Sequence, residues 1–247
     1  MDTQRAPAQD FQEAQDYQPL HGKSRTGFIR KVYGIITAQV LVTALWNVIL
    51  FNSPRLQQIV QTSDILNIVM IAITLICTFT LALSRDLAKQ VPLNYYLLAG
   101  VTFSTAYSLG IATLQFDPAI VVQAFVLTAA AFAGITYYAT TTNGTWNYLN
   151  ASVYCSLAIL VVSLGSYVFL PRGISNLVLS ALFALASGIG LMIQTEYVIG
   201  KKEMQYSQDD YIQASMRIYT ELVNLFLELL KILDSLQDKK KDDKKKK

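Results

Sequence analysis

Residues 65–83 read ILNIVMIAITLICTFTLAL, a run of nineteen residues without a charged side chain. A helix of about 20 apolar residues spans the roughly 30 Å hydrocarbon core of a bilayer. Charge returns at once with Arg85 and Asp86, where such a helix would leave the hydrocarbon. The segment therefore predicts a membrane-spanning helix, and the chain is predicted to be an integral membrane protein.

Six further apolar segments of similar length accompany this one, and short polar connections separate them. We predict these additional helices at residues 32–51, 93–113, 120–138, 148–170, 174–193 and 212–233. The connections leave no room for a separate soluble domain. The predicted fold is an all-α bundle of seven transmembrane helices, in which a polar-faced seventh helix lies at the centre.

The charged residues divide the chain into three regions. Only 15% of the 247 residues are charged, against about 25% in an ordinary soluble domain. We predict a disordered cytosolic tail at 1–30, the transmembrane domain at 31–236 and a lysine-rich tail at 237–247. The net positive charge is confined to that last tail, so we expect contact with membrane lipids and none with nucleic acid.

Basic residues beside the helices predict orientation. Lys31 before the first helix, and Arg85 and Lys89 after the second, place the N-terminus in the cytosol. Seven crossings would then put the lysine-rich tail on the opposite side, against the same rule. Either the last helix does not cross fully, or packing overrides the charge of the tail. A lysine run at the C-terminus also fits a retrieval signal for the endoplasmic reticulum, which is read in the cytosol.

Patterns that carry enzymatic chemistry are missing from the sequence. The single histidine, His21, lies in the polar tail, and no metalloprotease helix, nucleophile elbow or glycine-rich phosphate loop occurs. No predicted transmembrane segment contains an aspartate, although intramembrane aspartyl proteolysis needs two. We expect neither enzymatic activity nor a cofactor.

The seventh segment holds the clearest candidate site. Ionisable groups at membrane depth are costly and commonly functional, and Glu221 is such a group. Asn224 and Glu228 follow three and seven residues later, on the same helical face. We expect this face to point into the bundle, and Glu228 to pair with Lys231. The alternative is that Glu221 makes a structural polar contact that fixes helix packing.

The sixth segment adds two candidates, Gln194 and Glu196, at its end. Glu196 fits a site at the membrane interface or a solvated helix end. Arg85, after the second segment, either fixes the topology or pairs with a buried carboxylate. Small residues recur at four-residue spacing, as in Ala186 and Gly190, which favours close helix packing.

Several blocks of the chain resemble the transmembrane Bax inhibitor motif family. They are KVY at 31–33, DDYI at 209–212, IYTELVNLF at 218–226 and LKIL at 230–233. The resemblance extends from about Arg30 to the lysine-rich end. It implies a seven-helix bundle associated with protection from cell death and with calcium leak from the endoplasmic reticulum, and possible partners of the Bcl-2 type.

The resemblance also implies roles for single residues. In the family, two aspartates of helices six and seven share a proton and close the pore, and an arginine after helix two pairs with one of them. Glu221 matches one aspartate, Arg85 matches the arginine, and Gln194 stands in place of the other aspartate. Two adjacent carboxyl groups form a pH sensor because they do not ionise together, whereas an amide does not titrate. We therefore expect altered pH gating, with calcium as the permeating ion and Glu221 as its transient ligand. A non-conducting scaffold that binds other membrane proteins is the alternative.

Overall fold

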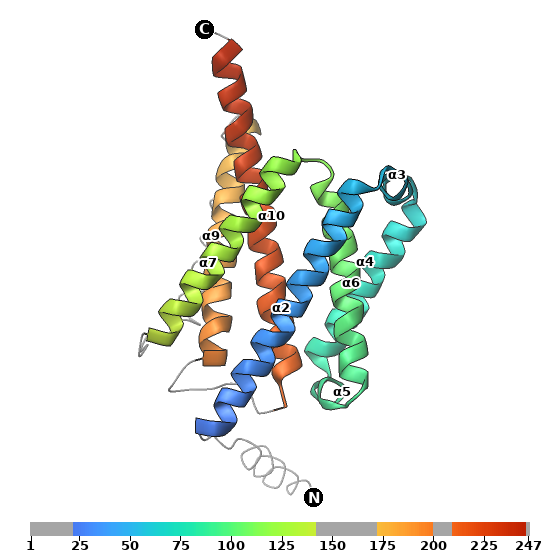
Figure 1. Cartoon of the computed structure of the whole chain (residues 1–247), viewed down its shortest axis with the longest axis vertical. Helices are drawn as coiled ribbons and strands as arrows, with labels where there is room; N and C mark the ends of the chain where they lie inside the picture. The colour runs from blue at the N-terminus through green and yellow to red at the C-terminus, as the bar shows by residue number, and fades with distance from the viewer. Residues whose placement is uncertain (1–21, 142–171, 200–208, 246–247) are drawn as a thin grey trace, which may run out of the picture.

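A computed structural model of the chain describes residues 22–141, 172–199 and 209–245. Within these ranges all regular structure is helical, and the long helices form a bundle (Figure 1). The eight helices are α2 (Gly22–Asn52), α3 (Pro54–Thr62), α4 (Asp64–Leu83), α5 (Arg85–Lys89), α6 (Leu93–Thr113), α7 (Pro118–Thr141), α9 (Arg172–Ile199) and α10 (Tyr211–Lys245). The predicted all-α class is confirmed for the described part of the chain.

Four of these helices are long and apolar enough to cross a membrane. The qualifying stretches are Thr26–Asn52 of α2, Asp64–Leu83 of α4, Pro118–Tyr137 of α7 and Val178–Ile199 of α9. Helices α6 and α10 form where helices three and seven were predicted, but their polar residues keep them outside this group. The predicted helix at 148–170 lies outside the described residues. Four spans are therefore supported, and seven stays a prediction.

Both predicted domain boundaries fall inside helices. Helix α2 begins at Gly22, so residues 22–30 are helical, where the sequence predicted a disordered tail. The cause is packing, since Phe28 is buried in line with Val32 and Ile36 at four-residue spacing. Helix α10 continues to Lys245 through the predicted lysine-rich tail. No glycine or proline interrupts that stretch, and lysine is a good helix former.

Helix α10 packs against more of the bundle than any other described helix. It contacts α9 most extensively, then α7 and α2, and also α6 and α5. Figure 1 shows it running between α7 and α9 on one side and α2 and α6 on the other. Ile212, Ile218 and Tyr219 are almost fully buried along it, and the two isoleucines join a core cluster that includes Leu81 and Leu191. The first half of α10 therefore forms much of the interior.

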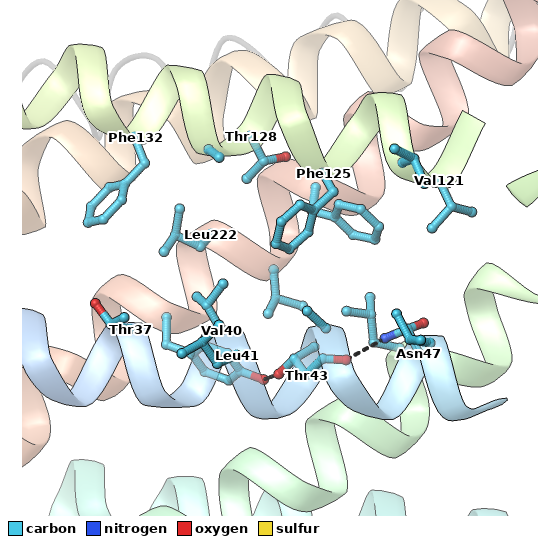
Figure 2. Close-up of a pocket in the computed structure, with 18 of the residues that line it drawn as sticks. Thr37, Val40, Leu41, Thr43, Asn47, Val121, Phe125, Thr128, Phe132 and Leu222 are labelled. Carbon is cyan, nitrogen blue, oxygen red and sulfur yellow. Dashed lines mark hydrogen bonds between the residues drawn. The ribbon is translucent and has the colours of Figure 1, made fainter. Parts of the chain in front are cut away.

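Polar side chains inside the bundle are hydrogen-bonded between helices. The hydroxyl groups of Thr43 and Tyr219 lie 2.8 Å apart, which joins α2 to α10. Gln39 Nε2 donates to Thr102 Oγ1 at 3.0 Å, which joins α2 to α6. Along α2, Asn47 Nδ2 donates to the carbonyl oxygen of Thr43 at 2.9 Å (Figure 2). Because the bilayer core holds no water to replace them, such bonds limit the cost of buried polar groups.

Gly110 on α6 packs closely against side chains of α2. A Cβ atom there would lie 2.8 Å from Leu50 Cδ2 and 2.8 Å from Trp46 Nε1, which is too close for any real contact. At Gly134 on α7, a Cβ atom would meet nothing within 4 Å.

We expect Gly110→Ala to be less stable than Gly134→Ala by about 1–3 kcal/mol, the usual cost of overpacking. Both changes replace glycine by alanine within a helix, so the gain in helix propensity cancels between them. Thermal unfolding of each variant in detergent, followed by circular dichroism, measures the difference. Equal melting temperatures would contradict the close approach at Gly110.

Candidate functional site

The carboxyl group of Glu221 on α10 lies against the backbone of α9. A Cβ atom at Gly190 would be 2.9 Å from Glu221 Cδ and 3.0 Å from each carboxyl oxygen. With the Glu221 side chain in this conformation, a Cβ atom at residue 190 would force the carboxyl group to shift. The small-residue spacing that ends at Gly190 is thus a packing feature, as predicted, and its partner is the ionisable residue of α10.

The polar face of α10 is only partly turned inward. Glu221 is half-buried, and the Asn224 side chain hydrogen-bonds to its carboxyl group. Asn224 itself is exposed, so the prediction that the whole face points into the bundle is wrong at this residue. The physical reason is competition for the interior, which Tyr219 and Leu222 occupy on the adjoining side of the helix.

Gln194 lies on the face of α9 that meets Glu221. It follows Gly190 by four residues, one helical turn, so the two positions share a face. Glu196 follows Gly190 by six residues and therefore points in another direction. Both side chains are half-buried and both have interaction partners. Of these two candidates, Gln194 is the one that α9 directs toward α10 near Glu221.

The structure describes Glu228 among the remaining predicted residues, and it lies apart from this contact. Glu228 is two turns further along α10, roughly 10 Å from Glu221 by helical rise. Its Oε1 atom accepts from Lys231 Nζ at 2.7 Å, which confirms the predicted pair. Arg85 begins α5, and its side chain lies outside what the structure describes. Within the described ranges, no group of three or more side chains of the kind that could hold a metal ion occurs.

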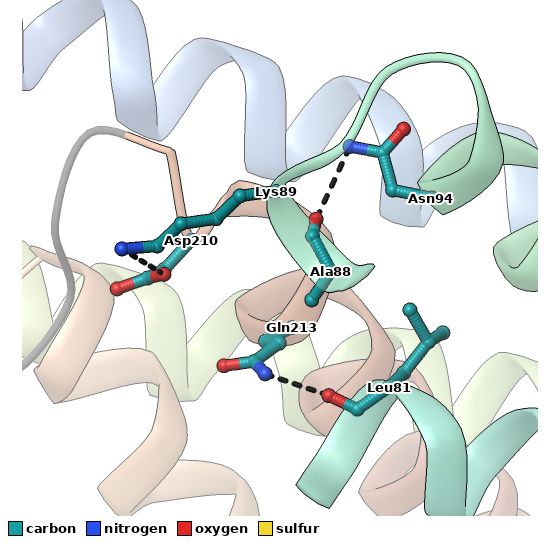
Figure 3. A network of polar contacts seen from close by, with 6 residues as sticks. All are labelled: Leu81, Ala88, Lys89, Asn94, Asp210 and Gln213. Carbon is teal, nitrogen blue, oxygen red and sulfur yellow. Dashed lines mark hydrogen bonds and ion pairs between the residues drawn. The ribbon is translucent and has the colours of Figure 1, made fainter. Parts of the chain in front are cut away.

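A second polar cluster, at the start of α10, was not predicted from the sequence (Figure 3). Gln213 Nε2 donates to the carbonyl oxygen of Leu81 at 2.6 Å, near the end of α4. Lys89 Nζ of α5 lies 3.9 Å from Asp210 Oδ1. Asn94 Nδ2 donates to the carbonyl oxygen of Ala88 at 3.2 Å. These contacts hold the α4–α5–α6 connection against the start of α10. The sequence indicated this cluster only through two polar residues, Asp210 just before α10 and Gln213 in its first turn.

Comparison with known proteins defines the class. A family model described as "Inhibitor of apoptosis-promoting Bax1" matches residues 25–238, which is most of the chain. The chain therefore belongs to the Bax inhibitor family, and the resemblance found in its sequence blocks is confirmed.

Individual relatives from distant organisms match over most of their length. A Golgi anti-apoptotic protein of Vaccinia virus (strain Lister) is 33% identical over 210 residues, which cover 85% of this chain and 86% of the viral protein. Protein lifeguard 4 of Mus musculus is 30% identical over 215 residues, or 87% of each chain. Bax inhibitor 1 of Schizosaccharomyces pombe is 29% identical over 217 residues, covering 87% of this chain and 78% of the yeast protein.

The contact between Glu221 and Gly190 generates a prediction about stability. We expect Gly190→Ala to lower the melting temperature in detergent, because the new methyl group displaces the carboxyl group. Gly188→Ala is the matched control on the same helix, since a Cβ atom there meets nothing within 4 Å. In a Glu221→Ala background the penalty of Gly190→Ala should disappear, as a double-mutant cycle measures. An equal penalty in both backgrounds would show that the two residues are not in contact.

The polar cluster at the start of α10 generates a further prediction about stability. Gln213→Met leaves the Leu81 carbonyl without this partner, at a cost of about 1–3 kcal/mol. Lys89→Met removes an ion pair whose lysine side chain is 37% exposed, so solvent screening keeps the loss below about 1 kcal/mol. Thermal unfolding of both variants should therefore rank Gln213→Met as the less stable. The reverse order would mean that the ion pair, rather than the amide, holds α4 to α10.

Proposed function

We propose that this protein is a multi-pass membrane protein that modulates cell death and intracellular calcium as a calcium-permeable leak. Family membership and relatives named for anti-apoptotic action support the role in cell death. One observation carries the leak, namely the carboxyl group of Glu221 held at the contact between α9 and α10. An ionisable group among membrane-length helices is costly, and it is commonly retained because it lies on an ion path.

Helix α10 is the proposed central, polar-faced helix of the pore. Its contacts with α2, α6, α7 and α9 support this role, because movement of α10 would alter every one of these interfaces. Carboxylate oxygens are the ligands that Ca²⁺ prefers, so Glu221 offers a transient binding point for a passing ion. In the closed arrangement the same carboxyl group fills the space over Gly190. Opening of the proposed pore then requires α9 and α10 to separate where Glu221 contacts Gly190.

The pH response follows from the chemistry of residues 194 and 221. Two neighbouring carboxyl groups repel each other once both have lost their protons, and this repulsion opens a proton-sensitive gate. Gln194 offers an uncharged amide instead, whose NH₂ group can donate to a protonated or an ionised carboxyl group, more strongly to the ionised one, and which carries no charge of its own. Loss of the Glu221 proton therefore creates no charge repulsion with residue 194. We propose that calcium leak in this protein depends only weakly on pH.

The experiment is calcium flux into liposomes that contain the purified full-length chain. We expect Glu221→Gln to abolish most of the flux, and Asp64→Asn, an exposed change at the start of α4, to leave it intact. The wild-type flux should change little from roughly pH 6 to roughly pH 8, whereas Gln194→Asp should introduce a steep response. A steep wild-type response that depends on Glu196 and not on Glu221 would overturn the assignment.

A non-conducting membrane scaffold is the second candidate. It is favoured by the tight Glu221–Gly190 contact, in which the carboxyl group occupies the place that a methyl group at residue 190 would take. In that case Glu221 fixes helix packing, and the protein acts by binding cell-death proteins, for which Bcl-2-type proteins are the first to test. Absence of flux from the wild type, with loss of such binding in Glu221→Gln, would identify the scaffold.

We propose residence in the endoplasmic reticulum, with the Golgi as the other endomembrane to consider. The lysine-rich end supports the first, and the name of the viral relative supports the second. Fluorescence microscopy of the tagged chain beside markers of the two compartments distinguishes them.

A further inference from the structure

An elongated apolar groove lies between α2 and α7, with α10 as its floor (Figure 2). Its volume is about 560 Å³. The lining runs along α2 from Ile36 to Asn52 and along α7 from Pro118 to Phe132, and no charged side chain contributes to it. The groove is separate from the Glu221 contact, because neither Glu221 nor any residue of α9 lines it.

The groove opens sideways toward the position that lipid would occupy. Leu41 and Val48 on the α2 rim are each 57% exposed, and Val122 on the α7 rim is 63% exposed. Both walls belong to helices that are long and apolar enough to cross a membrane. A lateral opening between two such helices faces the hydrocarbon of the bilayer, so the occupant enters from the membrane.

The dimensions of the groove restrict what that occupant is. Ile36 to Asn52 covers roughly 24 Å of helix axis, so 560 Å³ gives a mean cross-section of roughly 23 Å². The centre of a water-sized sphere can therefore move over about 5 Å, which corresponds to a channel about 8 Å wide once the roughly 1.4 Å radius of the sphere is added on each side. A polymethylene chain, whose carbon contacts lie at about 4 Å, fits such a channel. A helix with side chains is about 10 Å across and does not.

The polar groups of Thr43, Asn47 and Tyr219, which line the groove, suit an apolar occupant because they already form hydrogen bonds within the protein. Tyr219 and Thr43 both line the groove, and their hydroxyl groups hydrogen-bond to each other. The Asn47 amide donates to the Thr43 carbonyl oxygen and accepts from Thr113. An occupant therefore does not have to supply hydrogen bonds within the groove.

We propose that this groove binds one acyl chain of a bilayer phospholipid, whose headgroup stays at the membrane surface. The chain reaches about 15 Å, half of the hydrocarbon thickness, and thus lies within the length of the groove. It contacts α2, α7 and α10 together, and it fills the space between α2 and α7. The proposal does not depend on calcium permeation.

Photolabelling of the intact protein tests this site. Proteoliposomes of the full-length chain carry a small fraction of phosphatidylcholine with a diazirine in one acyl chain. They are dissolved in lipid-free detergent before irradiation, so that loosely held lipid is lost. We expect mass spectrometry to find label on α2 and α7 and little on the exposed face of α4, which includes Ile68 and Ile76.

Two matched variants sharpen the test. Ala44→Trp places a large side chain in the groove, and we expect it to lose the label. Ala72→Trp on the exposed face of α4 should keep it. Should Ala44→Trp fail to fold, as judged by circular dichroism, the wild-type labelling map decides alone.

Four results would overturn the proposal. They are equal labelling of α4, no label after detergent dilution, full labelling of a folded Ala44→Trp variant, and preferential retention of a photoreactive sterol over the phospholipid. Cross-linking between two copies through cysteine introduced at Leu41, in undiluted membranes, would likewise assign the groove to an interface.

Discussion

The burial of α10 from Tyr211 to Phe226 is the packing on which the arrangement of the other helices depends. Ile212, Ile218 and Tyr219 are almost fully buried there, against residues of α2, α4 and α9. Lipid tails are as apolar as these side chains, so helices associate in a bilayer through close packing and internal hydrogen bonds. Both are present around α10, in the Gly190 contact with Glu221 and in the Tyr219–Thr43 hydrogen bond.

The two ends of this buried segment are held by different means. At its start, the Gln213 amide joins α10 to the end of α4, and the ion pair of Asp210 with Lys89 lies at the surface. Further along, at Glu221, the constraint is steric, because the backbone of α9 approaches the carboxyl group at Gly190. A separation of α9 from α10 at Glu221 is thus compatible with an intact connection to α4. These two means of attachment are compatible with the proposed gate at the α9–α10 contact and with a fixed attachment of the start of α10 to α4.

The proposed effect of glutamine at residue 194 depends on where this residue lies relative to Gly190 and Glu221. The sequence block that contains Glu221 resembles the family, and the family match extends over residues 25–238. Glutamine at 194 stands on the face of α9 that carries Gly190, one turn beyond the Glu221 contact. Glu196 is six residues from Gly190 and therefore points to another face of α9. The proposed weak pH response of the leak rests on this placement of an uncharged amide, rather than a carboxyl group, at residue 194.

The sequence by itself determined the helical class and most helix positions, and it singled out Glu221 as a candidate site residue. Long uncharged runs such as 65–83 have one stable form in a bilayer, and an ionisable residue within such a setting stands out by its cost. The pairing of Glu228 with Lys231 was also predictable, because residues three apart on a helix are neighbours. The resemblance of the 218–226 block correctly indicated the family.

Only the tertiary structure decided which side chains meet across helices. Helical periodicity places Asn224 beside Glu221, but whether that face is covered depends on neighbouring helices, and Asn224 is exposed. The contact of Glu221 with Gly190, the Gln213–Leu81 hydrogen bond and the groove between α2 and α7 join segments far apart in the chain. The start of α2 at Gly22 likewise follows from burial of Phe28 in the shared core. Local sequence sets the period of a helix, whereas its partners and ends depend on packing against the rest of the molecule.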